Sequence, residues 1–546
     1  MAGTPRRFWL SIVFLGVAFL ALACGGDDDG GGGGSGATDD GDDSPASPAN
    51  ADLRMAGADP ITLDPALAGD AGSATYIVEI FGGLVTLDQD LQIIPDLAES
   101  WDVSADGLTY TFHIRQDAKF HDGKPVTAND FKYSLDRTAQ LGQTVSATAE
   151  AYLGDIVGAK DVTRGRTEEI AGVQVIDART LEVKIDAPKA YFLAKLTYPT
   201  AFVVDQQQVE ANPRNWTRKP NGTGPYKMAE WRLNERIILE ANADYHLGAP
   251  MVNRVLYVLA GGSTLTQYEN DELDVAGISV NDIERVLSDR DPLNADYRSG
   301  DNLSVSYIGF NVTQPPFDDP NVRRAFAMAI DRDQIVRVVL KDMLDVANSY
   351  MMPGLPGYNS NASVPGFDPE GARAALAASQ YENAAGLGEV TLTEIGGGAS
   401  AGVATQAIIE MWRTNLGVDV SIAQSEPASF FDDLDRGRLQ MFDIGWIMDY
   451  PDPEDIIDLL FHSTSRQNNT HYSNPEFDAL VEEARTEADV TKRLQLYQDA
   501  EQILLQDLPW IPLYFGRDHF VVKPHVKGFN PLPIVIPMLR YLSIEE

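Results

Sequence analysis

The sequence is poor in cysteine and in basic residues. One of its 546 residues is cysteine, so no intramolecular disulfide can form. Lysine and arginine number 42 against 81 aspartates and glutamates, which gives a formal net charge of −39. Repulsion between like charges excludes unaided binding to nucleic acid or to an anionic bilayer. The charge balance favours a protein that meets neutral or cationic solutes.

Histidine is also scarce, and the 7 histidines include no pair at the i, i+4 spacing of a helical metal site. Asp452, Glu454 and Asp455 offer the oxygen ligands that a hard cation prefers. Asp452 stands directly before Pro453, however, and this order is typical of a helix N-cap followed by proline in the first turn. We therefore predict a helix start there, no bound metal and no other cofactor.

The chain is too long for one hydrophobic core, which stops growing at roughly 250–300 residues. Its apolar fraction of 44% is nevertheless sufficient to bury cores. These two facts predict a folded body of two or more lobes.

The N-terminus has the pattern of an export signal. Arg6 and Arg7 precede an uncharged apolar run, residues 8–23, which is shorter than the roughly 20 residues of a membrane span. We predict a signal peptide at 1–23. The run ends in Ala-Leu-Ala before Cys24, which resembles a bacterial lipobox, in which the cysteine is acylated. Ordinary signal cleavage beside an incidental cysteine is the alternative.

Residues 24–50 differ from the rest of the chain. They contain seven aspartates, a glycine run and no basic residue. Such a segment cannot bury apolar surface, so we predict a disordered acidic tether rich in Gly, Asp and Pro, with a reach of roughly 25–30 Å.

The remaining sequence predicts mixed α/β structure. Apolar and polar residues alternate along 108–115 and 181–186, the pattern of half-buried strands. Asp319 and Asn474 each precede a proline and an apolar helical stripe, and Thr127 begins a capping-box pattern. Because strands and helices alternate, layered α/β architecture is favoured over a β-sandwich or a helix bundle.

Several segments together resemble the bacterial extracytoplasmic solute-binding proteins of family 5, the binding components of peptide and nickel ABC importers. The clearest is Gly-Thr-Gly-Pro-Tyr at 222–226. The segments follow the family's order: 63–66, 84–87, 95–101, 120–128, 222–226, 236–240, 242–245, 308–311, 322–326 and 445–453.

The resemblance implies a two-lobed α/β fold of the periplasmic-binding-protein type (type II), with an extra inserted subdomain. It also implies two chain crossings that act as a hinge, near 303–310 and near 508–515. The expected parts are a discontinuous lobe I at 51–84, 220–302 and 506–546, the inserted subdomain at 85–219, and lobe II at 303–505.

The segment 442–450 carries the candidate ligand site. If it is extended, Gly445 leaves room for another backbone, so a peptide can add as a strand. The α-ammonium of that peptide needs a carboxylate partner. By resemblance, Asp449 stands where peptide-binding members carry their ammonium-binding aspartate, and Trp446 matches a pocket tryptophan. The alternatives are a turn or capping role for Asp449 and plain core packing for Trp446. Some oligopeptide binders carry an arginine where this chain has Asp443.

A serine nucleophile motif, G-x-S-x-G, occurs at 398–402 around Ser400, between a predicted strand and a predicted helix. Asp449 and His519 follow it in the order Ser, Asp, His. No oxyanion-hole segment is evident, and two further glycines make the stretch a generic turn. A secreted serine hydrolase therefore stays a remote alternative.

We expect a non-enzymatic substrate-binding lipoprotein that captures di- or oligopeptides outside the cytoplasmic membrane and delivers them to an ABC permease. The expected partners are the peptide, the permease and ATPase subunits, and the membrane through lipidated Cys24. We expect a monomer and no nucleic acid. Within the family, the alternative ligands are an oligosaccharide, a nickel complex or another small solute.

Overall fold

The computed structural model describes residues 52–145, 148–396 and 401–545. The predicted signal peptide, the acidic tether with Cys24, and Ser400 lie outside these ranges.

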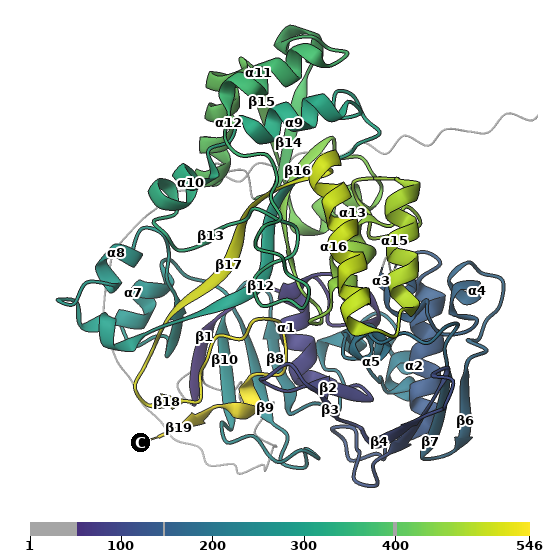
Figure 1. Cartoon of the computed structure of the whole chain (residues 1–546). Coiled ribbons are helices and arrows are strands. Elements are labelled where there is room, and N and C mark those ends of the chain that lie inside the picture. The colour runs from purple at the N-terminus through teal and green to yellow at the C-terminus, as the bar shows by residue number, and fades with distance from the viewer. Residues whose placement is uncertain (1–51, 146–147, 397–400, 546) are drawn as a thin grey trace, which may run out of the picture. The chain divides into compact units, whose positions relative to one another are not determined.

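An 11-stranded sheet runs through the described body (Figure 1). Its order is β15-β14-β16-β12-β17-β11-β1-β10-β9-β8, and β13 pairs with β17. The strands are β1 (Leu53–Ala56), β8 (Tyr226–Arg232), β9 (Arg236–Ala241), β10 (Arg254–Val258), β11 (Val275–Gly277), β12 (Tyr297–Phe310), β13 (Asp345–Val346), β14 (Val390–Ile395), β15 (Val420–Ser425), β16 (Met441–Ile447) and β17 (Trp510–Val522).

The two longest strands, β12 and β17, lie antiparallel in the middle of this sheet (Figure 1). Strands β14, β15 and β16 lie beyond β12, and β11, β1, β10, β9 and β8 lie beyond β17. The pairing of β12 with β17 is irregular between Asp301 and Val305 and again between Ser306 and Tyr307. Both predicted hinge segments overlap these strands, so a small change in their twist would move one side of the sheet relative to the other.

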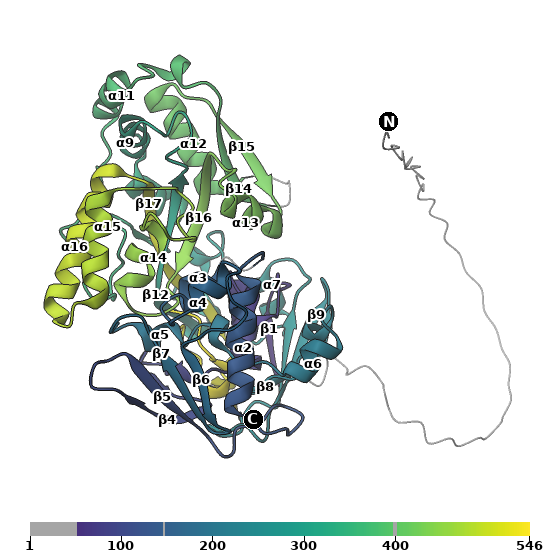
Figure 2. The same cartoon turned by 90° about the vertical axis from the view of Figure 1, so that its right-hand side faces the viewer.

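A separate four-stranded antiparallel sheet has the order β4-β5-β7-β6. Its β5 and β7 confirm the two strands expected at 108–115 and 181–186. Figure 2 shows helix α2 beside this sheet. The short strands form three small groups: β4 (Ala98–Val103), β5 (Thr109–Ile114), β6 (Val173–Asp177) and β7 (Thr180–Lys184); β2 (Val85–Leu87) and β3 (Ile93–Pro95); β18 (Val526–Lys527) and β19 (Ser543–Ile544).

The helices begin where the sequence places caps. Asp319 and Asn474 accept backbone hydrogen bonds at the starts of α9 and α15, and Thr127 forms a capping box at α2, as predicted. The α-helices are α1 (Ala71–Ile80), α2 (Ala128–Leu141), α3 (Thr148–Leu153), α4 (Ala159–Thr163), α5 (Phe192–Lys195), α6 (Gln206–Ala211), α7 (Thr264–Glu269), α8 (Ile283–Val286), α9 (Pro320–Met328), α10 (Arg332–Gln334), α11 (Pro369–Ala378), α12 (Val403–Leu416), α13 (Pro427–Asp435), α14 (Ile457–Phe461), α15 (Pro475–Thr486) and α16 (Val490–Asp507).

Shorter helical turns connect these elements. They are η2 (Pro65–Leu67), η3 (Pro199–Ala201), η4 (Trp216–Arg218), η5 (Pro292–Asp296), the π-helical η6 (Ile335–Val339), η7 (Ala384–Leu387), η8 (Pro453–Asp455) and η9 (Leu539–Tyr541).

The Gly-Thr-Gly-Pro-Tyr segment has a packing role. The backbone N–H groups of Thr223 and Gly224 donate to the carbonyl oxygen of Ile80, at the end of α1. A Cβ atom at Gly222 would lie 2.0 Å from that oxygen, and one at Gly224 would lie 2.4 Å from the carbonyl oxygen of Glu79. Both glycines are therefore required for the close approach of α1 to the strand β8.

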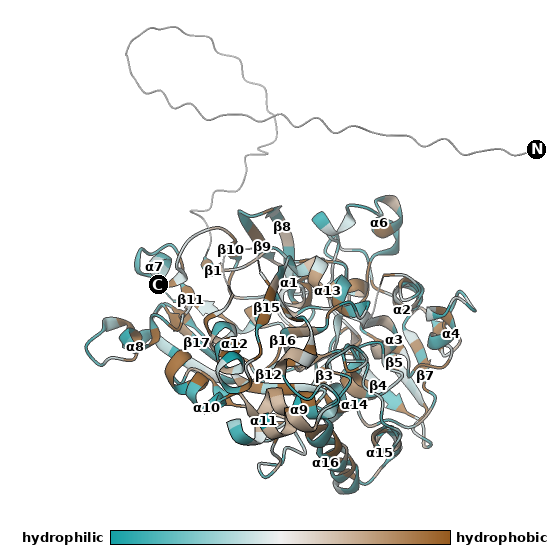
Figure 3. Ribbon diagram, turned by 90° about the horizontal axis from the view of Figure 1, so that it is seen from above, coloured by the Kyte–Doolittle hydropathy of each residue, from teal (hydrophilic) through white to brown (hydrophobic). Residues whose placement is uncertain are grey.

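Distinct hydrophobic cores hold the parts of the body together. One packs the four-stranded sheet against α2, a second lies around β1 and β8–β10, and the largest surrounds β12, β14 and β16. Figure 3 shows α16 alternating between hydrophilic and hydrophobic residues, as an outer helix that packs on a core does. Tyr152 and Tyr198 come from the part of the chain that builds the four-stranded sheet, but they pack into the largest core, the one around β12, β14 and β16. The largest core therefore joins these two parts of the chain.

Candidate functional site

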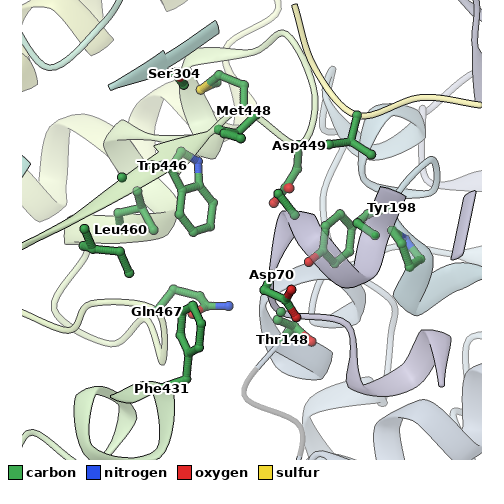
Figure 4. A pocket seen from close by; sticks show the side chains of 18 of the residues that line it. Asp70, Thr148, Tyr198, Ser304, Phe431, Trp446, Met448, Asp449, Leu460 and Gln467 are labelled. Atoms are coloured by element: carbon green, nitrogen blue, oxygen red, sulfur yellow. The ribbon is translucent and has the colours of Figure 1, made fainter. Parts of the chain in front are cut away.

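A cavity of about 540 Å³ lies between two walls. One wall comes from β16, α13 and the loop after α14, and the other from η2, α1, α3 and η3. Figure 4 shows Trp446, Leu460 and Gln467 on one side and Asp70, Thr148 and Tyr198 on the other, with Asp449 between them. Most of the lining is apolar or aromatic, as in sites that enclose small ligands.

The three residues singled out from the sequence, Gly445, Trp446 and Asp449, all line this cavity. Gly445 and Trp446 belong to β16, which pairs with β12 along its full length. The neighbouring strand β14 pairs only with residues 441–443. Among the described residues, no strand covers the other edge of 444–447. This edge is open to an added strand.

Gly445 is exposed in the cavity wall. A Cβ atom there would lie 3.3 Å from the carbonyl oxygen of Val305, a tight contact that a small shift relieves. The fold itself therefore tolerates a methyl group at this position better than at Gly222. The missing side chain leaves space on the cavity side, where another backbone could approach.

Asp449 presents a carboxylate with no cation beside it. The hydroxyl group of Tyr152 donates to its Oδ2 atom. Burial raises the pKa of Asp449 well above its usual range, although the Tyr152 hydrogen bond lowers it. Within the described residues Asp449 makes no ion pair. A partly buried carboxylate that lacks a counter-charge favours the arrival of a cation.

Asp455 fixes both candidate residues in place. Its Oδ2 atom accepts hydrogen bonds from the backbone N–H of Asp449 at 2.8 Å and from Nε1 of Trp446 at 3.2 Å. Burial and the charge of Asp449 raise the pKa of Asp455, which favours its protonated form. The indole of Trp446 is half-buried and anchored by this bond, so it is both packed and part of the lining.

The acidic group at 452–455 begins a helical turn, as predicted. Asp452 caps η8 by accepting from the backbone N–H of Glu454, and it pairs with Arg493 at 2.6 Å. The interpretation of the other acids as helix-start residues was incomplete. Glu454 is buried and pairs at 2.8 Å with Lys195, the last residue of α5. Among the described residues no group of acids or histidines has the arrangement of a metal site.

The opposite wall contributes residues that sequence reasoning missed. The rings of Tyr152 and Tyr198 stack with centroids 4.0 Å apart, and Tyr152 reaches Asp449 from 297 positions away in the chain. Asp70 and Asp435 also line the cavity. The only sequence signal for them was indirect: Asp70 precedes a helix and Asp435 stands in a run of acids, both of which have ordinary structural explanations.

Two residues of the alternative catalytic arrangement, Asp449 and His519, have other partners among the described residues. The carbonyl oxygen of Met343 accepts from Nε2 of His519, whose Nδ1 in turn accepts from the hydroxyl of Tyr297. Asp449 instead contacts Tyr152. The predicted strand and helix on either side of Ser400 are present as β14 and α12. Asp443, at the position of an arginine in some oligopeptide binders, accepts from Thr405 at 3.0 Å, and burial raises its pKa to about 6.

None of the helices in the described ranges is long and apolar enough to span a membrane.

Comparison with known proteins shows similarity along most of the chain. The dipeptide-binding protein DppE of Bacillus subtilis is 30% identical over 488 residues, which cover 87% of this chain and 88% of the relative. The structure of Haemophilus influenzae OppA in complex with the peptide RPPGFSPFR superposes with a TM-score of 0.80 at 25% identity, covering 90% of this chain and 98% of the other.

Two structures of a further protein superpose on this chain with different TM-scores. The structure of the Escherichia coli murein tripeptide binding protein MppA superposes with a TM-score of 0.80 at 28% identity, covering 90% and 98% of the two chains. Its unliganded open form gives a TM-score of 0.63 at 27% identity, with coverage of 90% and 96%. The present arrangement therefore differs more from that open form than from the other structure. The fold is the two-lobed α/β type II fold with an inserted subdomain, as expected.

A family model matches residues 92–468, more than half of the chain. Its description is bacterial extracellular solute-binding proteins, family 5. This match and the extent of the similarity to DppE agree with each other. The chain belongs to the bacterial extracellular solute-binding proteins of family 5.

Proposed function

We propose that the protein is the substrate-binding component of an ABC importer and that it captures di- or oligopeptides. The observation that carries this proposal is the partly buried carboxylate of Asp449, which lines the cavity and has no cationic partner among the described residues. The relatives named above bind peptides, which supports the same ligand class.

Peptide binding uses two features of β16. The open edge of residues 444–447 offers backbone groups to an added strand, which gives affinity for any sequence. Asp449 follows the end of this strand and pairs with the α-ammonium group of the peptide. Trp446 packs against a side chain of the bound peptide.

Ligand capture requires the lobes to open and close, because the cavity is lined from both walls. The Tyr152–Asp449 contact joins these walls, and the Lys195–Glu454 ion pair joins α5 to η8. A peptide that touches both walls gains its full contact energy only in the closed state, which shifts the population toward it. We place the hinge in β12 and β17, with lobe I at 51–84, 220–302 and 506–546, the inserted subdomain at 85–219 and lobe II at 303–505.

The proposed location is outside the cytoplasmic membrane. Residues 1–23 act as the signal peptide, the acylated Cys24 anchors the protein, and 24–50 form the tether. The protein acts as a monomer and delivers its ligand to separate permease and ATPase subunits. Incorporation of labelled palmitate into the expressed chain, and its loss in Cys24→Ser, tests the anchor.

Calorimetry with purified protein tests the ligand class. We expect binding of unmodified tripeptides and no heat with cello-oligosaccharides or with chelated Ni²⁺. Binding of one of the latter two, with none of the peptides, would assign the protein to another ligand within the family. Reaction of Ser400 with a fluorophosphonate, together with a hydrolytic activity lost in Ser400→Ala, would contradict the receptor role.

A further inference from the structure

The ionisable groups in the cavity lining are all acidic. Its described lining contains three carboxylates, those of Asp70, Asp435 and Asp449, and includes no lysine, arginine or histidine. Asp449 is assigned above to the α-ammonium group of a peptide. Two carboxylates therefore remain for the rest of the ligand, and no cation is available for a ligand carboxylate.

Of the two remaining acids, Asp70 already has a structural role. It caps α1 by accepting from the backbone N–H of Ser73 at 2.8 Å. The carboxylate of Asp435 makes no hydrogen bond and no ion pair with any described residue. Its carboxylate is therefore the one that is left for a ligand.

Helix α13 holds Asp435 toward the cavity. Phe430 and Leu434 are buried in the core and fix the helix, and Asp435 is its last residue. Asp432 and Asp433, by contrast, pair with Arg436 and Arg438 of the same segment and do not line the cavity.

The charge of Asp435 is not cancelled by its surroundings. Asp435 lines the cavity but remains exposed to solvent. Partial loss of solvent around it first, and the charge of Asp432 second, raise its pKa to about 6, while the charge of Arg466 lowers it. The guanidinium of Arg466 instead donates to the carbonyl oxygen of Gly142 at 2.7 Å. At pH 7 Asp435 is thus mainly ionised and has no direct counter-charge.

We propose that Asp435 makes this protein selective for peptides that carry a lysine or arginine side chain. The inference rests on the proposed function, because it assumes that Asp449 holds the α-ammonium group. The cationic side chain pairs with Asp435, while an acidic side chain meets only like charges in the cavity. The net charge of −39 adds long-range attraction for such peptides.

The same charge distribution makes the peptide's own carboxylate dispensable. Because no described lining residue can form an ion pair with it, C-terminal amidation removes a repelled charge and costs no contact. Cationic, amidated peptides are therefore the ligands best matched to this cavity.

The test is calorimetry with matched peptides at pH 7. Ala-Lys-Ala and Ala-Ala-Lys are compared with the same peptides carrying Nε-acetyl-lysine, which keeps the length of the side chain and removes its charge. Ala-Ala-Ala, Ala-Glu-Ala and the amidated form of Ala-Lys-Ala complete the set. The variants are Asp435→Asn and, as a control on the same helix, Asp433→Asn.

For the unmodified protein we expect lysine to be preferred over acetyl-lysine by roughly 10-fold or more in at least one of the two positions, the size of a charge-assisted contact. Asp435→Asn should reduce this ratio to below about twofold, and Asp433→Asn should preserve both the ratio and the binding of Ala-Ala-Ala. Amidation should not weaken binding.

Two results would overturn the inference while peptide binding persists. One is a lysine to acetyl-lysine ratio near one in the unmodified protein, and the other is an unchanged ratio in Asp435→Asn. Absence of binding by every peptide would instead contradict the proposed function, and the selectivity with it. Thermal unfolding of both variants confirms that they are folded.

Discussion

Asp449, which is partly buried, and Glu454, which is fully buried, lie five positions apart and have opposite surroundings. Glu454 pairs with Lys195 at 2.8 Å and accepts from the hydroxyl of Tyr450 at 2.5 Å. Asp449 receives the neutral hydroxyl of Tyr152 and no cation from the described residues. Burial raises the pKa of both groups above its usual range. One charge is thus neutralised by the protein, and the other is available to a ligand.

The contrast separates structural from functional charge. Lys195 is shared between Glu454 and Asp155, so one buried ammonium group offsets the charges of two buried carboxylates. Around Asp449 the same cost of burial is not offset. Substitutions in the first group should change stability, and substitutions at Asp449 should change affinity.

The largest effect is expected from Lys195→Met. This change leaves Asp155 with Lys189 alone and removes the counter-charge of Glu454, so we expect a loss of about 3–5 kcal/mol in the free energy of unfolding. Urea denaturation measures it. The control is Lys492→Met, whose exposed pairs with Glu483 and Glu487 should contribute under about 1 kcal/mol. If the two substitutions lowered the free energy of unfolding equally, the buried pair would be no more important for stability than the exposed pairs.

The next largest effect is expected from Asp449→Asn, and it is compared with the effect of Glu454→Gln. Asp449→Asn should weaken peptide binding by about 1.5–3 kcal/mol, because it removes one partner of a charge-assisted hydrogen bond. It should leave the free energy of unfolding unchanged or raise it. Glu454→Gln should do the reverse, with lower stability and little direct loss of affinity. Calorimetry and urea denaturation on both variants give the four values, and a reversed pattern would contradict the account.

A smaller effect is expected from Tyr152→Phe. This change removes the hydrogen bond to Asp449 and raises the pKa of that carboxyl further. We expect peptide affinity to fall by about 0.5–1.5 kcal/mol at pH 7. Calorimetry repeated at higher pH should recover part of the loss. No loss at any pH would show that the hydroxyl does not support the carboxylate.

The pH dependence should follow from the raised pKa of Asp449. In the unfolded chain an aspartate titrates near pH 4, whereas the folded protein keeps this proton to higher pH. Between these two values the native state binds more protons, so the contribution of Asp449 to stability falls as pH rises. Asp449→Asn should remove that slope, which we expect to amount to about 1 kcal/mol or more. Parallel urea curves from pH 4 to pH 8 provide the measurement, and equal slopes in both proteins would contradict it.

Local features of the fold were predictable from the sequence. Asp319 and Asn474 each precede a proline, and the alternation at 108–115 needs only one segment, so these elements match α9, α15 and β5. The order of family segments also predicted the fold. Such signals are contained in short stretches of chain, and tertiary contacts do not override them here.

The site was predictable on one wall and not on the other. Gly445, Trp446 and Asp449 stand in a single segment, and the structure places all three at the cavity. Tyr152 stands in a different part of the chain, and no local pattern indicates which carboxylate it meets. The partner of Glu454 was missed for the same reason. The capping pattern explains Asp452, but it contains no information about a contact between Glu454 and the distant Lys195.

The central claim is that the carboxylate of Asp449 pairs with the α-ammonium group of a peptide. A double-mutant cycle tests it most directly: calorimetry of the unmodified protein and Asp449→Asn, each with Ala-Phe-Ala and its N-acetylated form. We predict a coupling energy of about 1.5 kcal/mol or more, with acetylation harmful only when Asp449 is present. A coupling energy near zero, with acetylation equally harmful in both proteins, would contradict the account.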